Sequence, residues 1–424
     1  MNTTAQFTLS EDSLFLLVRA LVADELKALR HLDDDAIRPE HWHANTRIKG
    51  PAADPQDTAG SLHADSLEIM ALATRINTFF QMHRSGIEDY LLRYPSLGEW
   101  TELVGKSRDM GNRDITFTTS GSTGEPKHCD HAWDTLVSEV DFFLDQFAAT
   151  LGQPLQRVIA LSPPQHIYGF LFSVLLPERA GLPVLRGQRA LSLAWRGDFA
   201  AGDLILGFPF LWQQLNRQRL AFPEGTLGVT STGPSDPDVI SALTSRGLCA
   251  MVEIYGASET AGIGWRTTPE QPFALLPRWQ RSEQAPGQLL DATSGQTFSL
   301  SDHLHWQGER LLTPSGRIDQ AVQVGGINVF PERIAASLKA LPDVADARVR
   351  LMRPEEGSRL KAFVVPTADA PDSQPLRASL ESWCEQHLTP SERPKAFTFG
   401  PALPVNTMNK ATDWDIRSVP TGSH

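Results

Sequence analysis

The residues of this chain that are best suited to chemistry lie at positions 119–127, with the sequence Thr-Ser-Gly-Ser-Thr-Gly-Glu-Pro-Lys. Glycines allow backbone N–H groups to wrap an anion, while hydroxyl groups and a lysine ammonium bind phosphate oxygens. The stretch follows a strand-like segment, 115–118, and precedes a periodic apolar pattern that predicts a helix from about Trp133. That position indicates a phosphate-binding loop. It is not a Walker A loop, because Lys127 precedes His128 instead of a serine or threonine.

The 119–127 pattern resembles the phosphate loop of the adenylate-forming superfamily, whose members are acyl- and aryl-CoA synthetases, adenylation domains of peptide synthetases, and luciferases. A polar Gly/Ser linker is the alternative, and the proline, the lysine and the flanking strand disfavour it. The resemblance implies that ATP is a substrate whose phosphates are bound by these residues: Thr119, Ser120, Gly121, Ser122, Thr123, Gly124 and Lys127.

A second segment, 255–260 (Tyr-Gly-Ala-Ser-Glu-Thr), directly follows an apolar stretch typical of a strand. An aromatic ring at a strand's end can stack on adenine, and a carboxylate supplies an oxygen ligand for Mg²⁺. The segment resembles the superfamily's Tyr-Gly-x-Thr-Glu element. The resemblance implies that Tyr255 stacks on adenine, that Ser258 touches the α-phosphate, and that Glu259 holds Mg²⁺. It also implies that Gly256 contacts nucleotide and acid, whereas the alternative is an ordinary strand-to-helix turn.

Two further segments are expected to line the pocket for the acid. Residues 163–169 (Pro-Pro-Gln-His-Ile-Tyr-Gly) resemble a superfamily element in which His166 would shape the carboxylate side of the pocket and gate it against ATP. A lone histidine is more often structural. The turn 230–234 stands where the superfamily places small residues against adenine and the acid, which implies contacts from Thr232 and Gly233.

Two residues are implied to contact the ribose of the nucleotide. The segment 299–302 stands where the superfamily has Thr-Gly-Asp, and the two acceptor oxygens of Asp302 suit the two ribose hydroxyls. A helix cap or turn is the alternative for this aspartate. Arg317 lies in a segment that resembles the start of the superfamily's mobile C-terminal domain and would also reach the ribose.

That resemblance implies a rotating domain with three functional positions. Asp319 would be its hinge, and Gly326 would let backbone approach the incoming pantetheine thiol. Residues 403–410 resemble the superfamily's Pro-x-x-x-x-Gly-Lys loop, with asparagine in place of the glycine. Lys410 would then reach the carboxylate oxygen and the α-phosphate.

The resemblances cover about residues 114–410 and imply two half-reactions. A carboxylate attacks the α-phosphate of ATP, giving an acyl-adenylate and pyrophosphate, and a thiol then displaces AMP. Lys127, Lys410 and the Mg²⁺ on Glu259 would stabilise the charge that develops.

A narrower likeness to aryl-acid ligases of bacterial aryl-polyene pigment pathways favours a hydroxybenzoate-like acid and the pantetheine thiol of an acyl carrier protein as acceptor. Free CoA is the enzymatic alternative. A catalytically inactive nucleotide-binding scaffold is the alternative from another class.

The elements that must position these residues alternate between strand and helix patterns, which indicates an α/β fold. Strands are expected at 157–161, 204–206, 228–230, 251–255, 347–349 and 362–365, and C-terminal helices at 331–341 and 376–385. The expected domains are a helical region at 1–107, a large adenylation core with mixed sheets at 108–316, and a small mobile α+β lid at 317–424.

The region 1–107 predicts a helix capped by Ser10, a long loop at about 33–60, and helices over 66–80, 87–92 and 95–104. This order, with Asp-Ser-Leu at 65–67, resembles an acyl carrier domain. Ser66 would then carry a phosphopantetheine arm and make the chain self-loading. The alternative makes Ser66 a helix N-cap in an unrelated bundle.

Composition limits the remaining possibilities. The 424 residues carry a net charge of −12 and a pI near 5.5, so a generally basic nucleic-acid surface is not expected. Cys129, Cys249 and Cys384 are too widely spaced to indicate a disulfide framework or a zinc site. The N-terminus lacks a signal-peptide pattern and no apolar run reaches the length of a membrane span, which favours a cytoplasmic location.

Overall fold

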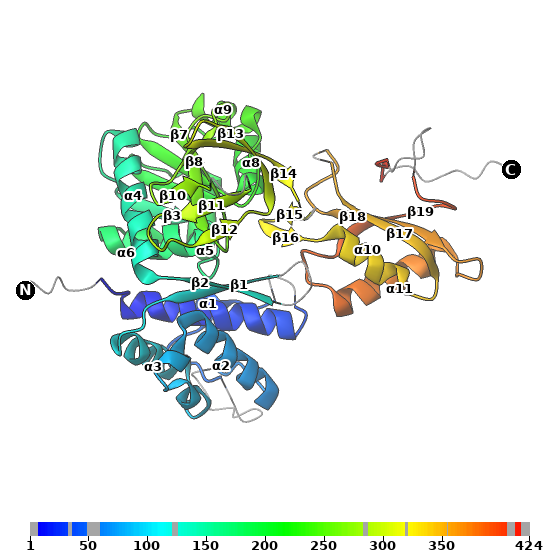
Figure 1. Cartoon of the computed structure of the whole chain (residues 1–424). Helices are drawn as coiled ribbons and strands as arrows, with labels where there is room; N and C mark the ends of the chain where they lie inside the picture. The colour runs from blue at the N-terminus through cyan, green and yellow to red at the C-terminus, as the bar shows by residue number, and fades with distance from the viewer. Residues whose placement is uncertain are drawn as a thin grey trace, which may run out of the picture. The chain divides into compact units, whose positions relative to one another are not determined.

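The computed structural model describes residues 7–32, 36–48, 60–120, 126–282, 287–318, 321–353, 355–404 and 412–416. The chain divides into two compact units, a larger one built mainly from residues up to Ser315 and a smaller one built mainly from Gly316 onward. In Figure 1 the colour of the larger unit runs from blue to yellow and that of the smaller unit from yellow to red. Six predicted site residues lie outside the described residues: Gly121, Ser122, Thr123, Gly124, Asp319 and Lys410.

Three helices form the N-terminal part of the larger unit, with short 3₁₀ turns between them. They are α1 (Glu11–Leu29), α2 (Ser66–Phe80) and α3 (Leu97–Asp109), and the turns are η1 (Pro39–His41), η2 (Met82–Arg84) and η3 (Glu88–Leu92). Ser10 caps α1 as predicted, and Asp65 and Ser96 form capping boxes with the glutamates three residues on. The alternative that made Ser66 an N-cap is wrong by one residue, because Asp65 accepts the free N–H groups and Ser66 is the first residue of α2.

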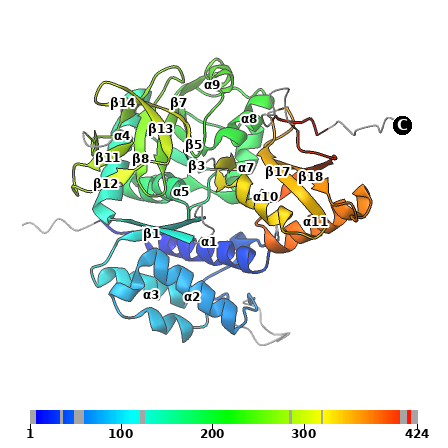
Figure 2. The same cartoon turned by 45° about the vertical axis from the view of Figure 1, so that its right-hand side comes forward.

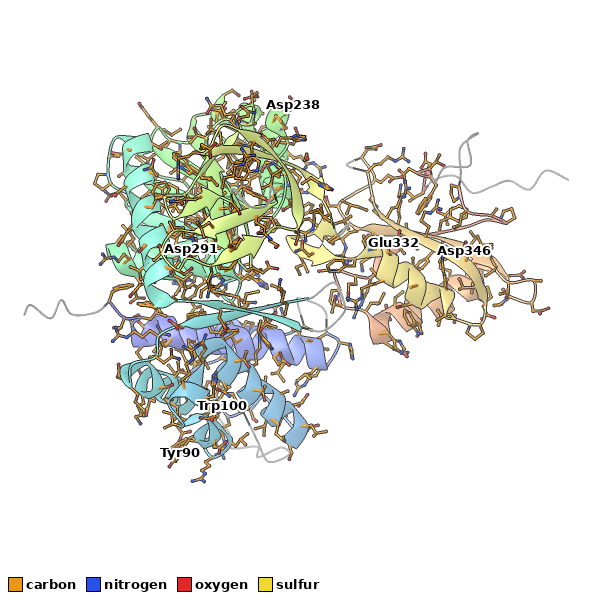
Figure 3. The ribbon with its side chains drawn as sticks, viewed as in Figure 1. Tyr90, Trp100, Asp238, Asp291, Glu332 and Asp346 are labelled. Atoms are coloured by element: carbon orange, nitrogen blue, oxygen red, sulfur yellow. The ribbon has the colours of Figure 1, made fainter. Side chains whose placement is uncertain are left out.

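These helices share one hydrophobic core with the strands that follow. Phe79 of α2 is fully buried, and its ring centroid lies 5.4 Å from Phe117 and 6.3 Å from Phe170. Figures 1 and 2 both show α1, α2 and α3 beneath the strands β1 and β2. In Figure 3, Trp100 lies inside this layer, and its indole N–H donates to the Leu91 carbonyl at 2.8 Å. The helical region is therefore a layer of the larger unit that buries its apolar faces against it.

The larger unit is centred on a nine-stranded sheet in the order β13-β14-β9-β8-β7-β6-β5-β3-β4. Its strands are β3 (Arg157–Ala160), β4 (Val184–Leu185), β5 (Asp203–Gly207), β6 (Thr226–Thr230), β7 (Leu248–Ala257), β8 (Ala261–Arg266), β9 (Phe273–Leu275), β13 (Asp302–Gln307) and β14 (Leu311–Arg317). Strands β4, β3, β5, β6 and β7 run parallel, and β8 and β9 continue the sheet antiparallel. The four strands predicted between residues 157 and 255 are confirmed. A second sheet contains β10 (Trp279–Arg281), β11 (Gln288–Asp291) and β12 (Thr297–Ser299).

The parallel strands are buried on both faces, which explains their continuous apolar sequences. Val158 of β3 belongs to the core shared with α4 (Trp133–Leu151) and the π-helical turn Phe170–Leu175. Its neighbour Ile159 belongs to the opposite core. The helices of that opposite core are α7 (Gly187–Arg196), α8 (Pro209–Arg217) and α9 (Pro237–Thr244). The short helices α5 (Ile167–Gly169) and α6 (Leu176–Ala180) flank the π-helical turn.

The predicted phosphate loop does not connect a strand to a helix. Strand β1 (Ile115–Ser120) pairs antiparallel with β2 (Pro126–His131), so Thr119 lies opposite Lys127 and α4 begins only after β2. The expectation of a strand–loop–helix unit is therefore wrong.

The smaller unit contains the hairpin β15 (Val322–Val324) and β16 (Ile327–Val329) and a three-stranded sheet of β17 (Val344–Leu351), β18 (Leu360–Pro366) and β19 (Pro394–Phe399). Helices α10 (Pro331–Lys339) and α11 (Ser373–His387) pack on one face of that sheet, against alternate residues such as Ala362 and Val364 (Figure 2). The predicted α+β organisation is confirmed. None of the helices in the described part of the chain has the length and apolar character needed to cross a membrane.

Candidate active site

Residues 255–257 end β7, and residues 258–260 connect it to the antiparallel strand β8, so the segment 255–260 forms a hairpin and not a strand-to-helix turn. The Thr260 hydroxyl oxygen accepts the N–H of Ala257 at 3.1 Å and closes the turn. A Cβ atom at Gly256 would lie 2.2 Å from the carbonyl oxygen of Ala261. Glycine is therefore required at this position by close backbone packing.

Two predicted nucleotide contacts meet at this turn. The hydroxyl of Tyr255 donates to Oδ2 of Asp302, the first residue of β13, at 2.8 Å. The two residues are 47 positions apart in the chain. The fold thus places the ring expected to stack on adenine beside the carboxylate expected to bind ribose.

The predicted phosphate lysine meets the predicted magnesium ligand. Nζ of Lys127 on β2 lies 2.5 Å from Oε1 of Glu259, with side-chain exposures of 54% and 33%. An ion pair so open to water contributes only about 0–1 kcal/mol. Each side chain can therefore leave its partner and bind a charged group of the ligand at little cost. A carboxylate is a suitable Mg²⁺ ligand, because protein sites for Mg²⁺ commonly use one or two carboxylates together with substrate phosphates.

The turn after β6 is held in a strained conformation. Thr232 has φ of +76°, a left-handed value that a β-branched residue adopts only under constraint. Its hydroxyl oxygen is buried and has no hydrogen-bond partner among the described residues. The neighbouring Ser231 hydroxyl donates to the Ile254 carbonyl at 2.8 Å, which ties this turn, including Gly233, to the end of β7.

His166 precedes the helix α5 on the acid-binding segment. The residue keeps exposed surface, yet protein surrounds it closely enough that desolvation lowers the pKa of its ring. The charges of Asp24 on α1 and Arg75 on α2 act on that pKa in opposite directions. The helical layer therefore reaches the neighbourhood of the predicted acid pocket.

The residues around His166 are fixed to the sheet. The hydroxyl of Tyr168 donates to the carbonyl oxygens of Gly207 and Val229, at 3.0 and 2.9 Å, beside the carboxyl ends of β5 and β6. A Cβ atom at Gly169 would lie 1.8 Å from the carbonyl oxygen of Pro163. The sequence pattern gave Tyr168 and Gly169 no role, and the structure makes them the anchor of this segment.

The predicted residues of the smaller unit lie at turns and strand ends. Arg317 ends β14, and Gly326 occupies the turn between β15 and β16 with φ of +85°. In the larger unit, Ser120 ends β1.

Three polar residues near the turn were not predicted from sequence; His131 and Glu139 are buried, and Arg278 is half-buried. His131 lies on β2, Glu139 on α4, and Arg278 immediately before β10. Desolvation lowers the pKa of His131 to about 4 and raises the pKa of Glu139 to about 7. Desolvation also lowers the pKa of Arg278. Their sequence neighbourhoods have no motif, so only the folded chain shows that all three contact the segment 258–262.

A cavity of about 400 Å³ lies against α4. It is lined by Asp134, Thr135, Ser138, Glu139, Phe142, Leu276, Pro277, Arg278, Ala292 and Thr293. None of the predicted site residues is among them, but Glu139 and Arg278, which contact the segment 258–262, are.

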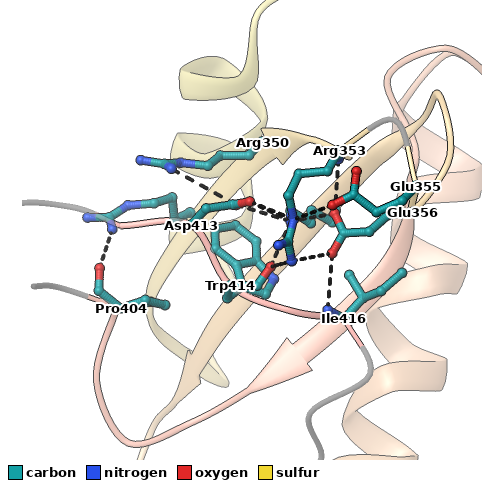
Figure 4. Close-up of polar contacts among 10 residues, drawn as sticks. Arg350, Arg353, Glu355, Glu356, Pro404, Asp413, Trp414 and Ile416 are labelled. Atoms are coloured by element: carbon teal, nitrogen blue, oxygen red, sulfur yellow. Dashed lines mark hydrogen bonds and ion pairs between the residues drawn. The ribbon is translucent and has the colours of Figure 1, made fainter.

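In the smaller unit, an ionic network holds the segment 412–416, which follows the predicted Lys410 loop (Figure 4). Lys361 is completely buried, and its ammonium lies 2.7 Å from Glu356 and 3.0 Å from Asp413 and donates to the Trp414 carbonyl at 2.7 Å. Desolvation alone would raise the pKa of Glu356, but hydrogen bonds from Arg353 and Lys361 outweigh it and lower the pKa to about 2. The Thr412 N–H also donates to the Pro404 carbonyl at 3.1 Å.

Comparisons with known families and proteins agree with this geometry. The AMP-binding enzyme family matches residues 104–293, and the AMP-binding enzyme C-terminal domain matches residues 333–410. A 4-coumarate--CoA ligase of Halorhodospira halophila is 36% identical over 95% of this chain and 99% of its own length. Another, of Rhodobacter capsulatus, is 37% identical over 91% of this chain and all of its own length.

More distant likenesses extend the comparison. A 3,4-dihydroxybenzoate--[aryl-carrier protein] ligase of Bacillus anthracis is 25% identical over 75% of this chain and 77% of its own length. The solved o-succinylbenzoate CoA synthetase of Bacillus subtilis superposes with a TM-score of 0.56 at 17% identity, over 96% of this chain and 93% of that chain. This last likeness concerns the fold alone.

Proposed function

Because the chain belongs to the family of AMP-binding enzymes, we propose that it joins an aromatic acid of the 4-coumarate type to the thiol of coenzyme A. The enzyme activates a carboxylic acid with ATP to an acyl-adenylate, with release of pyrophosphate. In the second half-reaction the thiol attacks the acyl carbon and AMP leaves. The observation that carries the proposal is the 36% identity to a 4-coumarate--CoA ligase over almost the whole of both chains.

The acceptor in this proposal differs from the one that the sequence patterns favoured. Relatives at 36% and 37% identity are named as CoA ligases, whereas the relative named for an aryl-carrier protein is 25% identical. The comparisons therefore support free CoA better than an acyl carrier protein. They also favour a hydroxycinnamate-type acid over the hydroxybenzoate expected first.

The larger unit binds the nucleotide in this proposal. Tyr255 stacks on adenine while its hydroxyl remains near Asp302, whose carboxylate accepts the ribose hydroxyls. Lys127 moves from Glu259 to the phosphates of ATP and neutralises the leaving pyrophosphate. Bound Mg²⁺, held by Glu259, would supply positive charge for the same phosphates.

The acid is positioned by the turn after β6 and by the segment that contains His166. The buried hydroxyl of Thr232, which lacks a partner among the described residues, can donate to an acid or nucleotide oxygen. Holding the acid carboxylate next to the α-phosphate makes the attack effectively unimolecular. His166 and Gly256 also contact the acid in this proposal.

The smaller unit supplies the remaining residues of the assignment. Lys410 donates to the carboxylate oxygen and the α-phosphate during adenylation, and Arg317 contacts the ribose. Rotation about Asp319 then replaces Lys410 with the segment around Gly326 for the thiol step.

The prediction that Ser66 carries phosphopantetheine stays open. Ser66 is exposed at the start of α2, beside Leu67, which is 77% exposed. Incubation with a phosphopantetheinyl transferase and CoA, followed by intact-protein mass spectrometry, decides the matter. A mass increase of one phosphopantetheine arm, absent in Ser66→Ala, supports self-loading, and an unchanged mass excludes it.

Acid-dependent exchange of pyrophosphate into ATP tests the first half-reaction. We expect exchange with 4-coumarate and related cinnamates, and weaker exchange with hydroxybenzoates, short fatty acids and amino acids. Lys127→Ala is expected to abolish it, while Lys106→Ala on the exposed surface of α3 is the matched control. ATP binding without exchange for any acid would instead favour the inactive scaffold.

A further inference from the structure

The backbone of residues 258–262 is held at alternate positions by three side chains from other parts of the chain. The carbonyl of Ser258 bonds to His131 of β2, the carbonyl of Thr260 bonds to Arg278, and the N–H of Gly262 bonds to Glu139 of α4. Each of these residues is far from the turn in sequence, except Arg278. Between the first two contacts stands Glu259, whose carboxylate is directed to Lys127.

His131 acts on this turn as a neutral donor. The residue is 5% exposed, and desolvation lowers the pKa of its ring to about 4, so the imidazole is uncharged near neutral pH. Nε2 lies 2.7 Å from the Ser258 carbonyl oxygen, which can only accept, and therefore Nε2 carries the proton. The ring centroid lies 5.7 Å from that of the buried Phe117, which fixes the imidazole from the side.

Glu139 holds the other end of the segment. Its Oε1 accepts the Gly262 N–H at 2.9 Å, although the residue is only 4% exposed. A Cβ atom at Gly262 would lie 2.5 Å from the same oxygen, so this approach is available only to glycine. The charged group that faces Glu139 is the guanidinium of Arg278, and its positive charge opposes the effect of desolvation.

Arg278 and its neighbour complete the set of contacts. The guanidinium of Arg278 lies over the Trp279 ring, 4.3 Å from its centroid, and donates to the Thr260 carbonyl. The indole N–H of Trp279 donates to the Gly262 carbonyl at 2.6 Å. Three of the five residues 258–262 therefore have main-chain contacts with four side chains from outside the turn.

Burying Glu139 and half-burying Arg278 is costly even with hydrogen bonds, because desolvating charged groups costs free energy and apolar residues of similar volume would fill the space at lower free energy. The contacts are all to backbone groups of one turn, and that turn carries Ser258 and Glu259. We propose that His131, Glu139 and Arg278 are positioning residues that fix the 258–262 backbone and thereby place the Glu259 carboxylate for Mg·ATP. The functional part of this inference rests on the role of Glu259 in the proposed function.

Two variants at each position distinguish the effect of losing the hydrogen bond from the effect of changing the shape of the side chain. His131→Gln retains an N–H donor and Glu139→Gln retains an acceptor oxygen, whereas His131→Leu and Glu139→Leu remove them. We expect both leucine variants to raise the Mg²⁺ concentration for half-maximal pyrophosphate exchange by about tenfold, with the KM for the acid unchanged. Both glutamine variants should remain within about twofold of the wild type.

Hydrogen–deuterium exchange of the peptide that covers residues 258–262 gives an independent readout. Faster exchange in the leucine variants than in the glutamine variants is expected. Equal exchange in both, or faster exchange without any change in Mg²⁺ dependence, would overturn the inference. If one leucine variant does not fold, the pair at the other position gives the same comparison.

The inference remains testable if the wild type does not activate any acid. In that case the proposed function fails, and Mg·ATP binding measured by calorimetry replaces pyrophosphate exchange. The same tenfold difference between leucine and glutamine variants supports the positioning role, and equal affinities contradict it.

Discussion

Two segments of this molecule are held near predicted functional residues by different kinds of contact. In the larger unit, the turn 258–262 is bound mainly through its backbone, by the neutral His131, the buried Glu139 and the half-buried Arg278. In the smaller unit, the segment 412–416 is bound by an ionic network around Lys361, in which Asp413 stays one-third exposed. Backbone contacts define the path of a turn closely, whereas an ionic network depends on charge and therefore on pH and salt.

This difference predicts that the nucleotide-binding turn of the larger unit is rigid. It also predicts that the attachment of the segment 412–416 to the smaller unit is more adjustable. This division suits the proposed two-step reaction, in which the nucleotide contacts persist while the smaller unit exchanges Lys410 for the segment around Gly326.

Lys410→Ala should lower acid-dependent pyrophosphate exchange by about 10²–10³-fold, the usual effect of removing one group that stabilises transition-state charge. Transfer from a synthetic coumaroyl-adenylate to CoA should be nearly unchanged, because Lys410 serves only the first half-reaction. Chromatography of the thioester measures the second step. Equal losses in both steps would contradict a role restricted to adenylation.

The pKa of His131, lowered from 6.5 to about 4, makes the larger unit sensitive to acid. Between these values the unfolded chain binds a proton that the folded chain does not, so the contribution of His131 to stability falls as the pH drops from about 6.5 to 4, by up to about 3 kcal/mol. The pKa of Glu139, raised from 4.5 to about 7, contributes with the opposite sign over nearly the same range. His131→Gln should remove the first contribution alone, which changes the slope of stability against pH in denaturant titrations at several pH values. A slope identical to that of the wild type would show that His131 does not titrate as described.

Lys361→Met should destabilise the smaller unit by about 2–3 kcal/mol, because it removes the buried cation shared by Glu356 and Asp413 and leaves Arg353, whose side chain is 42% exposed, as the cation that they share. Lys339→Met is the matched control, since its partner Asp346, labelled in Figure 3, forms a pair in which both side chains are exposed. The control should change stability by less than about 1 kcal/mol. Differential scanning calorimetry, with the two units' transitions resolved, measures both, and similar effects of the two substitutions would contradict the importance of burial.

Gly262→Ala should destabilise the larger unit by about 1–3 kcal/mol, because the new Cβ would lie 2.5 Å from Oε1 of Glu139. Gly287→Ala is a control without a nearby atom. Urea titrations compare the two variants. A destabilisation no greater than that of the control would show that the Glu139 side chain moves away from the new Cβ atom at little cost.

The sequence predicted much of the fold, because local signals determine it. The helix Ser66–Phe80 and the strands β3, β5, β6 and β7 follow directly from apolar periodicity and helix capping. Strand β2 was missed because Pro126–His131 is mostly polar and follows a glycine-rich loop. The carrier-like region has an ordinary order of helices, and only packing shows that Phe79 lies in the core of the larger unit.

The candidate site was predictable only where it resembles a family pattern. Tyr255 and Asp302, like Lys127 and Glu259, were each identified and are brought together by the fold. His131 contacts a residue 127 positions away and Glu139 one 123 positions away, and no local pattern encodes such contacts. The thiol acceptor of the second half-reaction was the least predictable part, because no single residue of the sequence distinguishes an enzyme that uses CoA from one that uses a carrier protein.

The most direct test of the account is the identity of the thioester formed when 4-coumarate, ATP and Mg²⁺ are offered together with equal amounts of CoA and a pantetheinylated carrier protein. We predict coumaroyl-CoA, with one AMP released per thioester, detected by mass spectrometry. Coumaroyl thioester found only on the carrier protein, or no thioester on either acceptor, would contradict it.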